Sequence, residues 1–128
     1  MPRGGHGVQV ILDSSFLIAV VERPTTWFED ITECVGKVQP VLLDCVKQEL
    51  QRLASGQGRS SRPARVALAM TSGFTHLRCG GASVDAEIVS NALTNGALVA
   101  TVDSGLLASL RSAHVKTVTL RRGRVSLA

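Results

Sequence analysis

Apolar and polar residues follow one another in blocks along this chain, and the lengths of the blocks predict strands that alternate with helices. Short apolar runs that fit buried strands cover residues 8–12, 40–43, 74–77, 97–101 and 116–120. Patterns of helical period cover residues 14–22, 25–36, 44–54, 62–72, 83–95 and 104–112. This alternation favours a mostly parallel sheet covered on both faces. We therefore expect a three-layer α/β/α sandwich with about five strands, to which residues 121–128 add a short edge hairpin.

The composition allows one self-sufficient domain. The chain has 128 residues, 45% of them hydrophobic, so we expect a single domain over residues 1–128 whose core needs no metal or disulfide. Cys34, Cys45 and Cys79 are odd in number, widely spaced and without a CxxC pair, which argues against a zinc site and a disulfide framework. We interpret them as thiols of a reducing compartment. Because the sequence contains neither a signal-peptide pattern nor a membrane span, we expect a cytoplasmic protein.

Two aspartates follow apolar strands closely, where an ionised carboxylate is costly to bury. Asp13 comes directly after VQVIL, and Asp103 comes two residues after ALVAT. Ligands of an open α/β sheet gather beyond the carboxyl ends of its strands. Two more acids lie beside the apolar stripes of their helices. Glu49 comes three residues after Val46, and Asp85 comes three residues before Ile88. All four carboxylates can therefore meet at one end of the sheet.

The same acids also have a purely structural interpretation. Asp13 and Asp103 are placed to cap the helices that follow them, and Asp85 suits the first turn of a helix. Asp44 is the residue we expect to act as a structural cap. The acids that we interpret as solvated surface charges are Glu22, Glu29, Asp30, Glu33 and Glu87.

Four carboxylates packed together repel one another, and a hard divalent cation removes that conflict. Mg²⁺ and Mn²⁺ take oxygen ligands in octahedral geometry and usually retain several waters. Such an ion lowers the pKa of an attacking water and neutralises charge on a phosphodiester as it is hydrolysed. Taken as a set, the four acids favour metal-assisted phosphodiester hydrolysis over helix capping alone.

In this order the residues resemble the PIN domain family of metal-dependent ribonucleases, over nearly the whole chain. The segments that carry the resemblance are VILDSS with Asp13, Ser14 and Ser15, PVLLDCVKQELQRL with Glu49, SVDAEIVSNAL with Asp85, and LVATVDSGLLASLRSAHVKTVTL with Thr101 and Asp103. Ser15 replaces the Asn of many members but is likewise polar. The compact size, the basic loop and the ending TLRRGRVSLA are most similar to archaeal PIN proteins related to ribosomal-RNA-processing nucleases.

The resemblance implies a PIN-like sandwich and an endoribonuclease that hydrolyses RNA, with a role in rRNA processing. It implies that Mg²⁺ or Mn²⁺ is held by Asp13, Glu49, Asp85 and Asp103. Thr101 and Ser15 would position water or the metal's other ligands. The family also implies frequent homodimers and a ribosomal partner.

Two alternatives stay open within this resemblance. One is the toxin of a VapBC-type toxin–antitoxin pair, with an antitoxin as its partner. The other is a non-catalytic RNA-binding factor of ribosome assembly. A phospho-acceptor receiver domain is disfavoured, because DSS lacks the required pair of acids and TLRR lacks the lysine. No P-loop motif occurs in the sequence.

Basic residues provide the surface that an RNA needs, and the net charge of +4 fits a polyanionic partner. The candidate RNA-binding residues are Arg52, Arg59, Arg62 and Arg65 around the segment 55–63, and Arg121, Arg122 and Arg124 near the C-terminus. Such side chains contact phosphates with little regard to sequence, although each could also be a solubilising charge. One Trp, three Phe and no Tyr argue against a platform of stacked aromatics. Trp27 and Phe28 fit a core or a dimer interface better. We expect single-stranded RNA, or structured rRNA or tRNA, as the substrate, and no membrane partner.

Overall fold

The computed structural model describes residues 7–128, which form six strands and six helices. The strands are β1 (Val8–Leu12), β2 (Val38–Leu43), β3 (Thr75–Leu77), β4 (Leu98–Ala100), β5 (Thr117–Arg121) and β6 (Arg124–Leu127). The helices are α1 (Ser14–Glu22), α2 (Trp27–Val35), α3 (Asp44–Ala54), α4 (Ser61–Met70), α5 (Val84–Asn95) and α6 (Ser104–Ser112). The predicted alternation of strands and helices is therefore confirmed.

One sheet runs through the molecule in the order β3-β2-β1-β4-β5-β6, and all neighbouring strands are parallel except β5 and β6. From β1 the chain continues towards β2, and from β4 it continues towards β5, in the opposite direction across the sheet. The junction of β1 and β4 is therefore the topological switch point. In open α/β sheets, ligands bind beyond the carboxyl ends of the strands at such a point.

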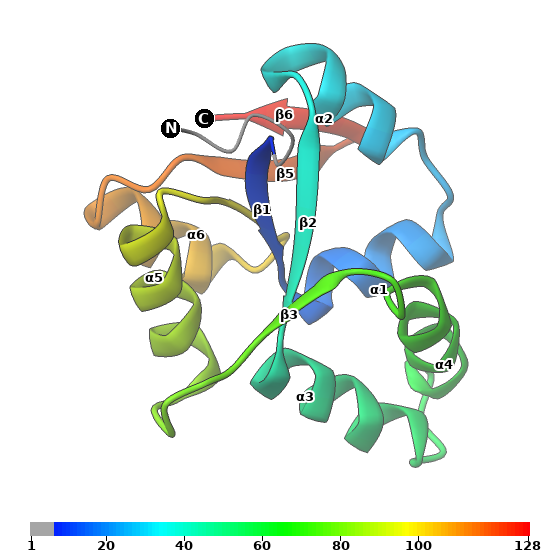
Figure 1. Ribbon diagram of the computed structural model, residues 1–128. Helices are drawn as coiled ribbons and strands as arrows, with labels where there is room; N and C mark the ends of the chain where they lie inside the picture. Colours follow the sequence, from blue (N-terminus) through cyan, green and yellow to red (C-terminus); the bar gives the residue numbers. More distant parts are fainter. Residues whose placement is uncertain (1–6) are drawn as a thin grey trace.

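Helices cover both faces of the sheet (Figure 1). α5 and α6 lie together on one side, and α1 and α4 lie on the other, where α3 packs against both of them. The central strand β1 is buried on both faces, since Val10, Ile11 and Leu12 are all fully buried. Trp27 packs edge-on against Phe16 of this core, whereas Phe28 is exposed. The expected three-layer sandwich is confirmed, with β6 as the sixth strand, formed by the expected edge hairpin.

The limits of several elements differ from the sequence expectation. β2 begins at Val38 and so contains Pro40, a residue that normally stops a central strand. The first residue of β3, Thr75, lies opposite Val41, so Pro40 stands where β2 has a neighbour on one side only. Ser83 caps α5 by accepting a hydrogen bond from the Ala86 N–H, as the sequence predicts. Among residues 7–128, no helix is both long and apolar enough to cross a membrane.

The expectation that Asp44 caps its helix is wrong. Asp44 is the first helical residue of α3, and the cap position belongs to Leu43, which forms no side-chain cap bond. β2 continues directly into α3, so the turn that a capping side chain would occupy does not exist. An acid in the first turn still interacts favourably with the helix dipole.

Candidate active site

The register of the sheet places Asp13 beside Thr101. Leu12 of β1 pairs with Ala100 of β4, so the next residue of each strand leaves the sheet at the same point. The Asp13 N–H donates to the Ala100 carbonyl over 2.9 Å, which continues the ladder to the site. Asp13 is only 6% exposed and Thr101 is fully buried. A charged residue and its polar neighbour thus lie at the switch point of the sheet.

Two hydroxyl groups bind one oxygen of the Asp13 carboxylate. Ser15 Oγ donates to Asp13 Oδ2 over 2.6 Å, and Thr101 Oγ1 donates to the same oxygen over 2.8 Å. Both hydroxyl oxygens also accept backbone N–H groups, from Val102 and Asp103 respectively. Within residues 7–128, the hydrogen bonds to this carboxylate all fall on Oδ2, which leaves Oδ1 for a ligand. Asp13 occupies the N-cap position of α1, as the structural interpretation expects, but its carboxylate makes no cap hydrogen bond to that helix.

Glu49 reaches the same region from α3. Its Oε1 accepts a hydrogen bond of 2.8 Å from the hydroxyl of Ser14, the residue after Asp13, which is itself buried. The position of Ser14 directly after Asp13 does not by itself predict this contact. Its contact joins the first turn of α1 to the middle of α3 and brings the second acid next to the first.

Asp103 has the capping role that the sequence allowed and is also linked to Thr101. Its Oδ1 accepts from the Leu106 N–H over 2.8 Å, which caps α6. Its own N–H donates to Thr101 Oγ1, which ties it to the cluster around Asp13. Gly105 leaves room for the cap, because a Cβ at that position would lie only 3.2 Å from Asp103 Oδ1. The second carboxylate oxygen of Asp103 remains for another partner.

Asp85 completes the group from the first turn of α5. Burial raises the pKa of its carboxyl, and the negative charges of Asp13, Asp103 and Glu49 raise that pKa further. None of the causes of this shift is a neighbouring cation. Asp13, Asp103 and Glu49 therefore lie near enough to Asp85 for their charges to raise its pKa, and no basic side chain offsets that effect.

The chemistry of these donors suits a hard cation. All four offer carboxylate oxygens, and Mg²⁺ binds through one or two carboxylates while it keeps several waters. The side chains do not form a closed set of ligands, however: among the described residues, no group of three or more His, Cys, Asp or Glu is arranged to hold a metal ion. Water and a substrate phosphate would thus have to supply the remaining ligands.

Glu87 is not a solvated surface charge, so that interpretation is wrong. The residue is only 7% exposed, and its carboxylate accepts the N–H groups of Gly80 and Ala82, each over 2.9 Å. These two bonds lower the pKa of Glu87. Glu87 fastens the loop of residues 79–84, which leads into α5 and Asp85. Its position two residues after Asp85 gave no signal of this contact in the sequence.

Cys45 and Cys79 form a disulfide, which corrects their interpretation as free thiols. Leu43 pairs with Leu77 across β2 and β3, so the two cysteines each lie two residues beyond a paired position. Parallel pairing thus brings together residues that are 34 positions apart. The disulfide joins the start of α3, which carries Glu49, to the 79–84 loop. Cys34 is free and exposed.

The candidate RNA-binding arginines are exposed but differ in their surroundings. Arg52 lines a cavity together with Gln48 and Val84, the neighbours of Glu49 and Asp85. Arg65 instead binds the Ala54 carbonyl and the Ser61 hydroxyl, so it stabilises the connection between α3 and α4. Arg59 lies in that same connection and Arg62 in the first turn of α4.

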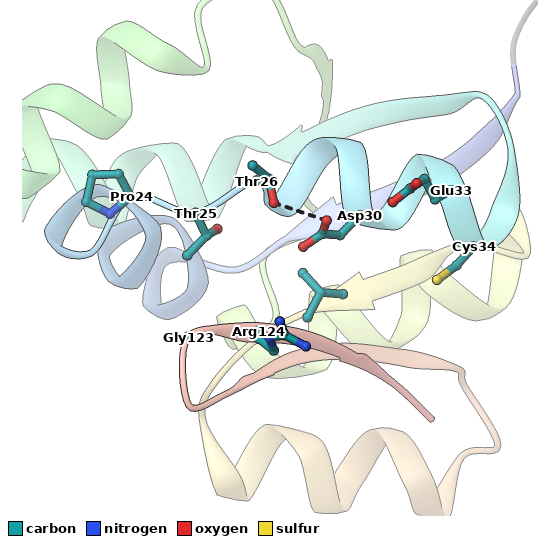
Figure 2. Close-up of a pocket in the computed structure, with 9 residues that line it drawn as sticks. Pro24, Thr25, Thr26, Asp30, Glu33, Cys34, Gly123 and Arg124 are labelled. Atoms are coloured by element: carbon teal, nitrogen blue, oxygen red, sulfur yellow. Dashed lines mark hydrogen bonds between the residues drawn. The ribbon is translucent and has the colours of Figure 1, made fainter.

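The C-terminal arginines lie around the β5–β6 turn. This turn borders a separate pocket beside α2, which Arg124 shares with Asp30 and Glu33 (Figure 2). Arg121 ends β5 and Arg122 stands in the turn, with a positive φ of 53°. Of the three arginines, only Arg124 thus shares this pocket with acids of α2.

The sequence and the fold both have known relatives. A family model described as a PIN-like domain matches residues 10–124. No curated protein matches the sequence. Among solved structures, the PIN domain endonuclease Utp24 is similar with a TM-score of 0.77 and 24% identity, over 93% of this chain and 90% of that chain. A domain of a functionally unknown protein from Methanocaldococcus jannaschii DSM 2661 is similar with a TM-score of 0.62 and 14% identity, over 91% of this chain and 94% of that one.

The structural likenesses concern the fold, and the family model concerns the sequence from β1 to the first residue of β6. Its match includes all four acids and the two hydroxyl groups that bind Asp13. Because the model spans most of the chain, this protein belongs to the PIN-like domain family.

Proposed function

We propose that this protein is an endoribonuclease that depends on a divalent metal ion. One observation carries the proposal: at the switch point Thr101 links the Asp13 carboxylate to the backbone of Asp103, and Ser14, next to Asp13, binds Glu49. The charges of these three acids also raise the pKa of Asp85. Such an arrangement costs free energy unless a cation binds there. The donor set favours Mg²⁺ or Mn²⁺.

The chain's own residues prepare the site before a substrate arrives. Ser15 and Thr101 hold the Asp13 carboxylate in one orientation through two hydrogen bonds to Oδ2. Ser14 orients Glu49. The metal ion, when bound by Asp13, Glu49, Asp85 and Asp103, supplies an acidified water and charge neutralisation at the phosphate. The buried hydroxyl network keeps the acids in position while that charge changes.

RNA is the substrate class that the family favours, and the structural relative is titled a PIN domain endonuclease. We propose a cytoplasmic role in rRNA processing by a homodimer. The alternatives are a toxin that acts with an antitoxin and an assembly factor that binds RNA without cleaving it. RNA cleavage distinguishes a nuclease from an assembly factor that only binds RNA. The identity of a co-purified partner then distinguishes the rRNA-processing enzyme from the toxin.

The test uses end-labelled single-stranded and hairpin RNA with Mn²⁺, Mg²⁺ or excess EDTA. Asp103→Asn is the diagnostic variant, since Asn caps a helix about as well as Asp and so preserves α6. Glu29→Gln is the matched control, because Glu29 is an exposed acid on α2. The proposal expects metal-dependent cleavage that the control retains and that Asp103→Asn loses by at least about a hundredfold. Equal cleavage by both variants would refute it.

A further inference from the structure

A cavity of about 460 Å³ lies between α3 and the segment that leads into α5, the two elements that carry Glu49 and Asp85. Its walls are one side of α3 and the 79–84 loop. Gln48 on the first wall precedes Glu49, and Val84 on the second precedes Asp85. The cavity is therefore lined by the sequence neighbours of two of the four acids.

The loop wall of this cavity is fastened at Cys79, Gly80 and Ala82. At Cys79 the disulfide ties the loop to Cys45 of α3, and the Cys45 N–H also donates to the Cys79 sulfur. At Gly80 and Ala82 the buried carboxylate of Glu87 binds two backbone N–H groups. A wall held in this way exists before any ligand binds, which reduces the ordering cost of binding.

Arg52 gives the cavity its charge. It is exposed, it stands one helical turn after Gln48 on α3, and it is the only charged residue that lines this cavity among the described residues. A guanidinium offers a planar set of N–H donors that matches a phosphate. Polar groups of Gln48 and Ser83 lie on the same walls. The lining thus suits a nucleotide with its phosphate.

We propose that the cavity between α3 and the 79–84 loop binds a nucleotide of single-stranded RNA next to the one that is cleaved, with Arg52 on its phosphate. The proposal rests on the proposed function for the identity of the ligand, although binding can be measured without cleavage. Arg52 acts here as a binding residue and makes no contact with the reacting atoms.

The test measures the affinity of a fluorescein-labelled single-stranded RNA by anisotropy in EDTA, at several salt concentrations. Arg52→Gln is compared with Arg111→Gln, since Arg52 and Arg111 are both exposed basic residues in the last turn of a helix. We expect Arg52→Gln to weaken binding about tenfold and to reduce the salt slope by about 0.7, the value for one lost contact to a single strand. Arg111→Gln keeps the wild-type affinity and slope.

A second variant, Gln48→Glu, tests the same cavity in case Arg52→Gln does not fold. Gln48→Glu adds a negative charge to the cavity, and Ser109→Glu adds the same charge to the exposed side of α6, away from the candidate RNA-binding arginines. Only Gln48→Glu should weaken RNA binding. In cleavage assays with Mn²⁺, Arg52→Gln should raise KM and leave kcat within about threefold, the pattern of a residue that binds ground state and transition state alike.

The outcomes separate this inference from the proposed function. RNA binding that depends on Arg52 without any cleavage would support the cavity and refute the nuclease. Cleavage with wild-type affinity in both Arg52→Gln and Gln48→Glu would support the nuclease and refute the cavity. No RNA binding by the wild-type protein would refute both.

Discussion

The Thr101 hydroxyl donates a hydrogen bond of 2.8 Å to Asp13 Oδ2 and thereby joins β4 to β1 across the switch point of the sheet. The same hydroxyl oxygen accepts the N–H of Asp103 over 3.1 Å. One buried side chain therefore fixes two of the four acids. Ser15 repeats the pattern from the other side, with a bond to Asp13 and one from the Val102 N–H.

Replacing Thr101 by valine should uncouple the two acids while it preserves the shape of the core. The change leaves the Asp103 N–H without its acceptor, at a cost of about 1–3 kcal/mol in the free energy of unfolding. Loss of a group that orients metal ligands typically lowers activity by about 10–100-fold. Thr117→Val, at a buried threonine of β5, is the control. Equal cleavage rates in the two variants would contradict the positioning role of Thr101.

The pH dependence of thermal stability should show whether the other acids act on Asp85. Because the pKa of Asp85 is raised on folding, its contribution to stability is greatest at low pH and falls as pH rises above the ordinary aspartate range, about pH 4. In EDTA, Asp85→Asn should therefore melt at a higher temperature than wild type at neutral pH. The two melting temperatures should approach each other in acid. A difference that does not depend on pH would mean that Asp85 is isolated from the other acids.

Glu87 should show the opposite dependence. Its pKa is lowered by the N–H groups of Gly80 and Ala82, so its stabilising effect is present above the ordinary glutamate range, about pH 4.3, and is lost as pH falls. Glu87→Gln places an NH₂ group against one of two N–H donors and should lower the melting temperature at neutral pH. Thermal melts from pH 7 down to pH 3 measure the effect, with Glu29→Gln as the control. If both variants melt alike at neutral pH, the loop does not depend on Glu87.

The disulfide should matter for both stability and activity. A bridge that closes 34 residues stabilises a domain by roughly 2–4 kcal/mol. Reduction with dithiothreitol, or Cys45→Ser, should therefore lower the melting temperature and slow cleavage, because Glu49 and the 79–84 loop lose their link. Cys34→Ser should change neither. An unchanged melting temperature after complete reduction, verified by thiol titration, would contradict this role.

The positions of Asp13 and Asp103 at strand ends could be predicted from the sequence, because a local pattern determines them. A buried run followed by an acid predicts both the strand and the position of Asp13, and the same holds for Asp103. Parallel strands then place both residues at one edge of the sheet. The spacing of Glu49 and Asp85 relative to apolar residues predicts that both lie on helices, next to the side that faces the core.

The contacts missed by the sequence analysis depend on register and on loop geometry. The disulfide follows from the pairing of Leu43 with Leu77, which no local pattern reveals. The role of Glu87 depends on the way the 79–84 loop folds back over α5. The cap of α3 was misassigned because β2 enters the helix without a turn, so the rule that places Asp at such a boundary did not apply.

The central claim is that the four acids form one metal centre, and a calorimetric titration of the purified protein with Mn²⁺ tests it most directly. Wild type and Glu29→Gln should bind Mn²⁺ with the same saturable isotherm. Asp13→Asn, which removes the charge at the switch point, should weaken that binding by at least about tenfold. If Asp13→Asn instead binds Mn²⁺ as tightly as the wild-type protein, the acids do not form the metal centre and the account is wrong.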